Sequence, residues 1–167
     1  MTQLSKHLAM SHLLLDLDVT SKKRLFEQVG LLFENESRIA RVTVFDALFA
    51  REKLGSTGLG FGVAIPHGRI KGVREMVATF IRTKEGVPFE APDGEPVRLV
   101  FAMLVPEHAN EQHLNMLSEL AQMFSDSDLR ERLLAETDST RVHALLTEWT
   151  PYTKYANHAP VKRSAAL

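Results

Sequence analysis

The segment VRLVFAMLVP, residues 97–106, decides the fold. Apart from Arg98 it carries apolar side chains at every position, so both faces of a strand formed here are apolar. A strand that is hydrophobic on both faces is typical of a central strand covered by helices on each side. We therefore expect an α/β protein in which helices flank a central β-sheet.

Elements on either side of this segment agree with that fold class. LLLDL (13–17) and VATFIR (77–82) are short apolar runs typical of strands, and Asp93-Gly94 predicts a tight turn between extended segments. Apolar residues at helical spacing predict five helices: one capped by Thr20 or Ser21, one from Thr43 to Gly55, and three over 109–124, 128–136 and 139–149.

The chain shows no internal repeat and no linker, which predicts one domain over residues 1–150. Residues 151–167 hold two prolines, end in small residues and lack periodicity. We expect them to form a mobile C-terminal tail.

The most unusual segment is GSTGLGFGVAIPHGR, residues 55–69, which holds five of the nine glycines. A Walker loop needs a lysine after its second glycine, but Phe61 follows Gly60. The dinucleotide fingerprint also fails, because no glycine occupies its third place and the preceding element is a predicted helix. Both nucleotide-loop interpretations are therefore excluded.

Glycines alternate with Leu59, Phe61 and Val63 over residues 58–63. In an extended segment this alternation predicts one face made of glycine and one apolar face. We expect the apolar face to be anchored in the core, with Leu59 and Phe61 serving as core anchors and not as partner contacts. The glycine face would let another chain or a ligand approach the backbone.

This segment leads to His67. Pro66 fixes its own φ and biases Ile65 toward extended geometry, and Gly68 is expected to leave open space beside the ring. A neutral histidine with one nitrogen bonded to a backbone acceptor can attack phosphorus with the other. The alternative is a histidine that only makes a hydrogen bond in a tight turn, and the residues leave both interpretations open.

A phosphorylated imidazole needs a cation and hydrogen-bond donors nearby. Arg51 lies on the last turn of the predicted helix before the glycine segment, and Ser56 and Thr57 follow that helix. Arg51 can bind phosphoryl oxygens as a fork, and the two hydroxyl groups can add donors. The alternative for Arg51 is a solvated charge at a helix C-terminus.

His113 heads the apolar stripe of its predicted helix, which continues through Leu117, Leu120, Ala121 and Phe124. It also lies in the first turn, where the helix N-terminus attracts anions. A buried structural histidine and a metal site are the alternatives. A metal site is disfavoured because no carboxylate or third histidine shares a short spacing with His67 and His113. We expect no metal and no cofactor.

Composition limits the possible partners. The chain has 167 residues and a net charge of −1, which gives no basic surface for nucleic acid or anionic lipid. It has no cysteine, so disulfides, thiolate catalysis and a cysteine phosphocarrier are excluded on this chain. The N-terminus resembles neither a signal peptide nor a membrane span, and we expect a cytoplasmic protein with no membrane insertion.

Three segments carry a family resemblance. REKLGSTGLGFGVAIPHGR (51–69) closely resembles the phosphoacceptor segment of the mannitol/fructose-type enzyme IIA domains of the phosphotransferase system. PVRLVFAMLVPEHANEQHLNMLSELAQMF (96–124) resembles that family's buried strand and the helix with its second histidine. LLLDLDVTSKKRLFEQVGLLF (13–33) is similar to the nitrogen-regulatory branch.

The resemblance implies a mixed central sheet flanked by helices, the mannitol-type enzyme IIA fold. It also implies that His67 is the phosphoacceptor, modified at its tele nitrogen, with His113 as the second active-site histidine and Arg51 beside the phosphate. Ser56 and Thr57 match the family's serine-threonine pair. A small HPr-like phosphocarrier, called NPr in the nitrogen branch, is the implied donor.

The absence of cysteine means that no IIB domain of this class lies on this chain, and there is no room for a membrane IIC domain. This favours the regulatory branch, whose phosphorylation state controls target proteins such as kinases or transporters. Two alternatives remain: a sugar-transport enzyme IIA that passes the phosphoryl group to a separate IIB protein, and a non-covalent interaction module on the same fold.

Overall fold

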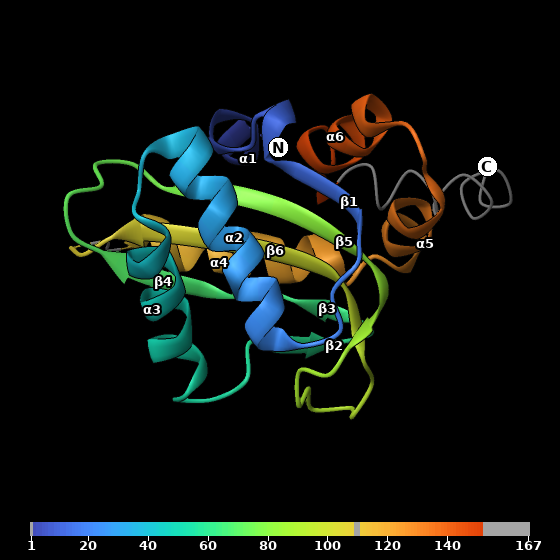
Figure 1. Cartoon of the computed structure of the whole chain (residues 1–167). Helices are drawn as coiled ribbons and strands as arrows, with labels where there is room; N and C mark the ends of the chain where they lie inside the picture. Colours follow the sequence, from blue (N-terminus) through green and yellow to red (C-terminus); the bar gives the residue numbers. More distant parts are fainter. Residues whose placement is uncertain (1, 109–110, 152–167) are drawn as a thin grey trace, which may run out of the picture.

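The computed structural model describes residues 2–108 and 111–151. A mixed six-stranded sheet forms its centre, in the order β1-β5-β6-β3-β2, with β4 also paired to β6 (Figure 1). The strands are β1 (Leu13–Leu17), β2 (Gly58–Gly60), β3 (Val63–Ala64), β4 (His67–Ile70), β5 (Val77–Val87) and β6 (Val97–Pro106).

The strand directions are mixed. β6 runs antiparallel to β5 and parallel to both β3 and β4, which follow one another along the chain. β1 is parallel to β5, and β2 is antiparallel to β3. The predicted mixed sheet is confirmed, and it places His67 at the first position of a strand that pairs with the central strand.

Helices cover both faces of the sheet. α2 and α3 pack on one face and α4 lies across the other, while α1, α5 and α6 contribute to the core on the α4 side (Figure 1). The helices are α1 (Thr2–His7), α2 (Lys22–Ser37), α3 (Arg41–Glu52), α4 (Glu111–Phe124), α5 (Ser127–Ala135) and α6 (Ser139–Thr147), with a short 3-10 helix over Met10–His12. None of the helices within the described ranges has the length and apolar character needed to cross a bilayer.

β6 explains why there are two cores. Its odd-numbered residues from Leu99 to Met103 face the core beneath α4, and its even-numbered residues from Val100 to Leu104 face the core beneath α2 and α3. All of them are at most 1% exposed. The predicted central strand, covered on both faces, is confirmed with its predicted bounds.

The predicted caps had mixed outcomes. Ser21 caps α2, because its side-chain oxygen accepts a hydrogen bond from the Arg24 N–H at 3.1 Å. The predicted start of α3 at Thr43 is wrong, since the helix begins at Arg41 and its N-cap, Ala40, has no capping side chain. The Glu34 carboxylate, from α2, accepts a hydrogen bond from the Arg41 N–H at 2.9 Å instead. A cap supplied by another helix is not visible in the local sequence.

Other boundaries follow the predictions closely. β1 has its predicted bounds, β5 continues past Arg82 to Val87, and α5 and α6 start within one residue of the predicted positions. The first two residues of the predicted 109–124 helix lie outside the described residues. So does the predicted mobile tail, apart from position 151.

Candidate functional site

The glycine segment forms a hairpin and not one straight extended run. Gly60, Phe61 and Gly62 have φ angles of +95°, +57° and +77°, and β2 returns antiparallel to β3. Glycine adopts positive φ without strain, but an aromatic residue rarely does. The predicted extended geometry is therefore wrong at Phe61.

The glycine face is covered by the same chain. A Cβ atom on Gly58 would lie 2.8 Å from the Ala91 Cβ, and one on Gly60 would lie 3.3 Å from an oxygen of Asp93. The Asp93 carboxylate also accepts a hydrogen bond from the Phe61 N–H at 2.8 Å. Asp93-Gly94 forms the predicted tight turn, closed by a bond from the Gly94 N–H to the Ala91 carbonyl at 2.9 Å. Residues 91–93 of the same chain therefore pack against the glycine face, in the place where another chain or a ligand was expected.

Leu59 and Phe61 are not core anchors. They are 40% and 71% exposed, whereas Val63 is buried as predicted. Phe61 lies in the turn that reverses the chain, where its φ is positive, and Leu59 lies on the exposed side of β2. The Phe61 ring lies 4.7 Å from the guanidinium carbon of Arg130, a residue of α5.

A series of backbone hydrogen bonds positions His67. The Ile65 N–H donates to the Thr57 carbonyl and the Met103 N–H donates to the Pro66 carbonyl, both at 3.0 Å. The His67 Nδ1 atom lies 2.9 Å from the Ile65 carbonyl oxygen. A carbonyl oxygen can only accept, so Nδ1 carries the proton and Nε2 carries the free lone pair.

Gly68 brings α3 close to His67. A Cβ atom on Gly68 would lie 2.7 Å from the Ala47 carbonyl oxygen, so the expected open space beside the ring is wrong on that side. Arg51 lies one turn beyond Ala47 on the same face of α3. Its Nη1 atom donates to the Gly55 carbonyl at 2.8 Å. The bare Gly68 backbone therefore lets α3 pack closely against β4, and the Arg51 charge acts on His67.

The structure places His113 beside His67. The two ring centroids are 5.5 Å apart with an interplanar angle of 52°. His113 is only 8% exposed, and its buried Nδ1 atom has no hydrogen-bond partner among the described residues. A buried polar atom without a partner is uncommon and calls for a functional explanation.

Both histidines are held in the neutral form. Burial lowers the pKa of His67 below its ordinary value, and the charges of Arg51 and Arg69 lower it further. The hydrogen bond to Ile65 and the Glu52 carboxylate act in the opposite direction. Burial, the neighbouring His67 and the Arg69 charge lower the pKa of His113. Neutral imidazoles at neutral pH follow from these effects.

The hydroxyl groups of Ser56 and Thr57 already donate to protein acceptors. Ser56 donates to the Phe89 carbonyl, and Thr57 donates to the Glu52 carboxylate at 2.6 Å. Each hydroxyl has one proton, so neither is ready to donate to a phosphoryl group in this arrangement. Their role as phosphate donors stays a prediction, and the geometry shows them organising the loop before β2.

Sequence reasoning missed two charged residues of the site. Arg69 follows His67 by two positions on β4, so the two side chains share one side of that strand. The alternation would have revealed Arg69 if a strand had been predicted there. Glu52 is the last residue of α3 and is only 8% exposed, and no periodicity marked it as buried.

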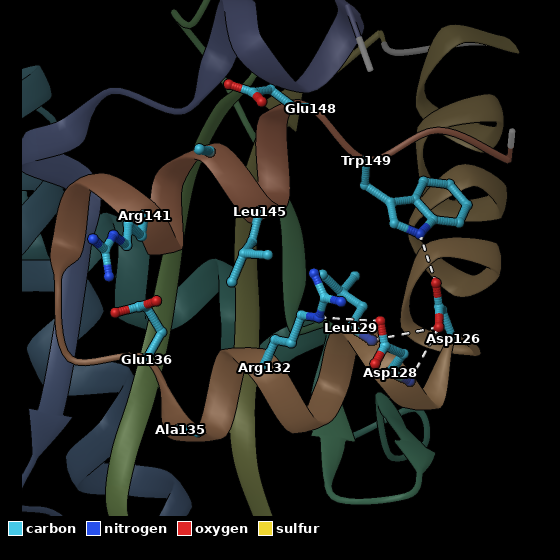
Figure 2. A pocket seen from close by; sticks show the side chains of 11 residues that line it. Asp126, Asp128, Leu129, Arg132, Ala135, Glu136, Arg141, Leu145, Glu148 and Trp149 are labelled. Atoms are coloured by element: carbon cyan, nitrogen blue, oxygen red, sulfur yellow. Dashed lines mark hydrogen bonds and ion pairs between the residues drawn. The ribbon is translucent and has the colours of Figure 1, made fainter. Parts of the chain in front are cut away.

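A cavity of about 610 Å³ lies away from the histidines, between α5 and α6 (Figure 2). Trp149 borders it and donates through Nε1 to Asp126 at 3.0 Å, and Arg132 pairs with Asp128 at 3.1 Å. None of its lining residues belongs to the histidine site. No group of three or more metal-ligating side chains occurs within residues 2–108 and 111–151.

Comparison with known families decides what this arrangement is. Residues 6–149 match the model of the phosphoenolpyruvate-dependent sugar phosphotransferase system EIIA 2 family. The chain belongs to that family. Within the EIIA 2 family it is 38% identical to a nitrogen regulatory protein of Pseudomonas aeruginosa over 89% of this chain and 97% of that relative.

Solved structures of the EIIA 2 fold agree. The nitrogen regulatory protein IIA-Ntr of Neisseria meningitidis superposes with a TM-score of 0.84 at 54% identity, covering 87% of this chain and all of that one. The mannitol IIA of Escherichia coli superposes with a TM-score of 0.70 at 26% identity, covering 83% and 97% of the two chains. The mannitol-type fold predicted from the sequence is confirmed, as is the similarity to the nitrogen-regulatory branch.

Proposed function

We propose that this chain is a regulatory phosphocarrier of the nitrogen phosphotransferase system. Nε2 of His67 accepts a phosphoryl group from the phosphohistidine of a small HPr-like carrier, the NPr type. The observation that carries the proposal is the 2.9 Å hydrogen bond from His67 Nδ1 to the Ile65 carbonyl, which leaves the Nε2 lone pair free.

The transfer balances without any further reactant. The lone pair of His67 Nε2 forms the new N–P bond while the N–P bond of the donor histidine breaks, and that electron pair returns to the donor ring. The proton on His67 Nδ1 stays in place, and its bond to Ile65 stabilises the positive charge that develops on the ring.

Three neighbours support this step, two by charge and one by a hydrogen bond. Arg51 and Arg69 both act electrostatically on His67, and their charges would attract phosphoryl oxygens bound there. His113 lies against His67 and can donate a ring proton to a phosphoryl oxygen. These roles for Arg51 and His113 are those predicted from the sequence, and Arg69 is added from the structure.

The regulatory part of the proposal draws on the relatives, which include nitrogen regulatory proteins of several bacteria. The chain has no cysteine that could receive the phosphoryl group next. Phosphorylation adds nearly two negative charges to the surface around His67, which changes binding to target proteins such as kinases or transporters. A cytoplasmic site of action is part of this proposal, because the phosphocarrier donor acts there.

The test is phosphorylation by a reconstituted donor system. The protein is incubated with phosphoenolpyruvate, enzyme I and the phosphocarrier, and its intact mass is measured. Wild type is expected to gain the mass of one phosphoryl group, and His67→Ala none. An equal mass gain on the His67→Ala variant would refute the assignment of the acceptor.

A sugar-transport enzyme IIA is the second candidate. It is favoured by 39% identity to a fructose-specific EIIA component of Haloferax volcanii, over 65% of this chain and 70% of that relative. The phosphorylated protein would then pass its phosphoryl group to separate IIB proteins. Transfer to a panel of purified IIB proteins would favour this second function, whereas retention of the group supports the regulatory one.

A further inference from the structure

Glu52 is a buried carboxylate that the proposed transfer step does not use. It ends α3 and is only 8% exposed, although the last residue of a surface helix usually reaches water. Burying a charge is unfavourable unless the charge is paired and hydrogen-bonded. Its presence one residue after Arg51 therefore suggests a task within the site.

Both oxygens of Glu52 have donors. Oε1 accepts from the Thr57 hydroxyl at 2.6 Å, and Oε2 accepts from the Thr57 N–H at 3.0 Å. Oε2 also lies 2.9 Å from Nζ of Lys22, the first residue of α2. Lys22 itself lies over the Phe89 ring, with Nζ 4.7 Å from the ring centroid. The end of α3, the loop at Thr57 and the start of α2 are thus held together.

A continuous series of hydrogen bonds leads from Glu52 to the His67 ring. Glu52 holds Thr57, whose carbonyl accepts the Ile65 N–H at 3.0 Å. The Ile65 carbonyl then accepts from His67 Nδ1 at 2.9 Å. On the far side the Pro66 carbonyl is fixed by the Met103 N–H of β6 at 3.0 Å. The Ile65 carbonyl, which selects the tautomer of His67, is therefore held by hydrogen bonds on both sides along the chain. The bonds on one side begin at Glu52.

We propose that Glu52, paired with Lys22, is a positioning residue that fixes the tautomer and orientation of the His67 ring through Thr57 and Ile65. The consequence for catalysis rests on the proposed function, but the effect on the ring does not. Arg51 holds the same loop at Gly55, so the loop that supports His67 is organised from two consecutive residues of α3.

The direct test is nitrogen NMR of the histidine rings in the full chain, without any donor protein. Wild type is expected to show His67 with its proton on Nδ1. In Glu52→Gln, one amide oxygen replaces two acceptors, so the ring should become a mixture of both tautomers. The pKa of His67 should also fall, because both the Glu52 charge and the Ile65 bond raise it in the wild type.

Glu34→Gln is the matched control. Glu34 also bonds a backbone N–H and a basic side chain, those of Arg41, but at the opposite end of α3. It should leave the tautomer and the pKa of His67 unchanged. An unchanged His67 ring in folded Glu52→Gln, or an equal change in Glu34→Gln, would overturn the proposal.

Two more variants cover the case in which Glu52→Gln does not fold. Thr57→Val removes the hydroxyl donor and leaves the Thr57 backbone bonds, so the same change should appear at smaller size. The double variant Lys22→Met/Glu52→Gln removes both charges together and leaves no unpaired buried cation. It should fold and show the mixed tautomer, and a pure Nδ1–H ring in both variants would refute the inference.

Transfer kinetics separate this inference from the proposed function. Glu52→Gln should lower the rate constant at saturating donor by about tenfold, the equivalent of one buried hydrogen bond, while the KM for the donor stays unchanged. If wild type accepts no phosphoryl group, the proposed function fails while the NMR result stands. If wild type is phosphorylated and Glu52→Gln changes neither the rate nor the ring, only the inference fails.

Discussion

The ring centroids of the two histidines of the site lie 5.5 Å apart, yet the hydrogen bonding around the two rings differs. His67 starts a strand, and its Nδ1 atom is hydrogen-bonded to a backbone carbonyl. His113 lies in the first turn of α4, and its Nδ1 atom is buried without a partner among the described residues. One ring is fixed in one tautomer, and the other has no bond at Nδ1 that would fix it.

This difference fits the separate roles proposed for the two rings in phosphoryl transfer. A nucleophile needs a lone pair in one known direction, and the Ile65 carbonyl supplies that condition for His67. A donor to a phosphoryl oxygen needs a ring nitrogen that carries a proton, and within the part of the chain that the structure describes no hydrogen bond at Nδ1 restricts which nitrogen of His113 carries it. Variants of each site residue test whether His67 acts as the nucleophile and His113 as the donor.

The largest effect is expected from His113→Gln. If His113 only stabilises charge, the variant still accepts a phosphoryl group at His67, but about 100-fold more slowly. Stopped-flow or quenched transfer from the phosphorylated donor measures this rate. Complete loss of acceptance in a folded His113→Gln protein would contradict the division of tasks.

Arg51 and Arg69 should affect the pKa values of the two histidines differently. The Arg51 charge acts on His67, whereas the Arg69 charge acts on both rings. Arg51→Gln should therefore raise the pKa of His67 alone, and Arg69→Gln should raise both pKa values, as measured by NMR titration. Each variant should also lower the transfer rate by about tenfold. Equal responses of the two rings to Arg51→Gln would contradict the asymmetry.

The smallest expected effect is on the pH dependence of the free energy of unfolding. The pKa of each histidine is lowered in the folded state, so above about pH 6.5 both states bind the same number of protons. Below that pH the unfolded chain takes up protons that the folded chain does not. The free energy of unfolding should then fall by up to about 1.4 kcal/mol per pH unit for each histidine.

Denaturant titration on either side of pH about 6.5 measures this loss, and the double variant His67→Gln/His113→Gln is the control. Its curve should be flatter in that window. The carboxyl groups with lowered pKa, Asp16, Glu34 and Asp93, lose their contribution only below about pH 4, so the comparison is made above that pH. An equal slope in the control would show that other groups cause the loss.

The sequence predicted the parts of the molecule that depend on local periodicity. β1 and β6 have their predicted bounds, and the cap at Ser21 is in place. These features depend on residue type and spacing, which the sequence states directly. That His67 and His113 share one site was implied by the resemblance to the enzyme IIA family, and the structure places the two rings side by side.

The failures have a common physical cause, which is a partner from a distant part of the chain. Glu34 caps α3 from another helix, and Asp93 bonds the Phe61 N–H across 32 positions. Gly68 serves the approach of Ala47, and not open space beside a ring. Long-range contacts of this kind cannot be inferred from one sequence by periodicity.

The second edge of β4 bears on how the protein avoids association with its own copies. β6 pairs with one of its edges, and within the described ranges no strand pairs with the other. An open edge invites pairing with another copy and, in the end, aggregation. Here the strand is four residues long, Pro66 precedes it without an N–H to offer, and Arg69 adds a charge. These features disfavour the addition of a second copy of the chain to this edge of the sheet.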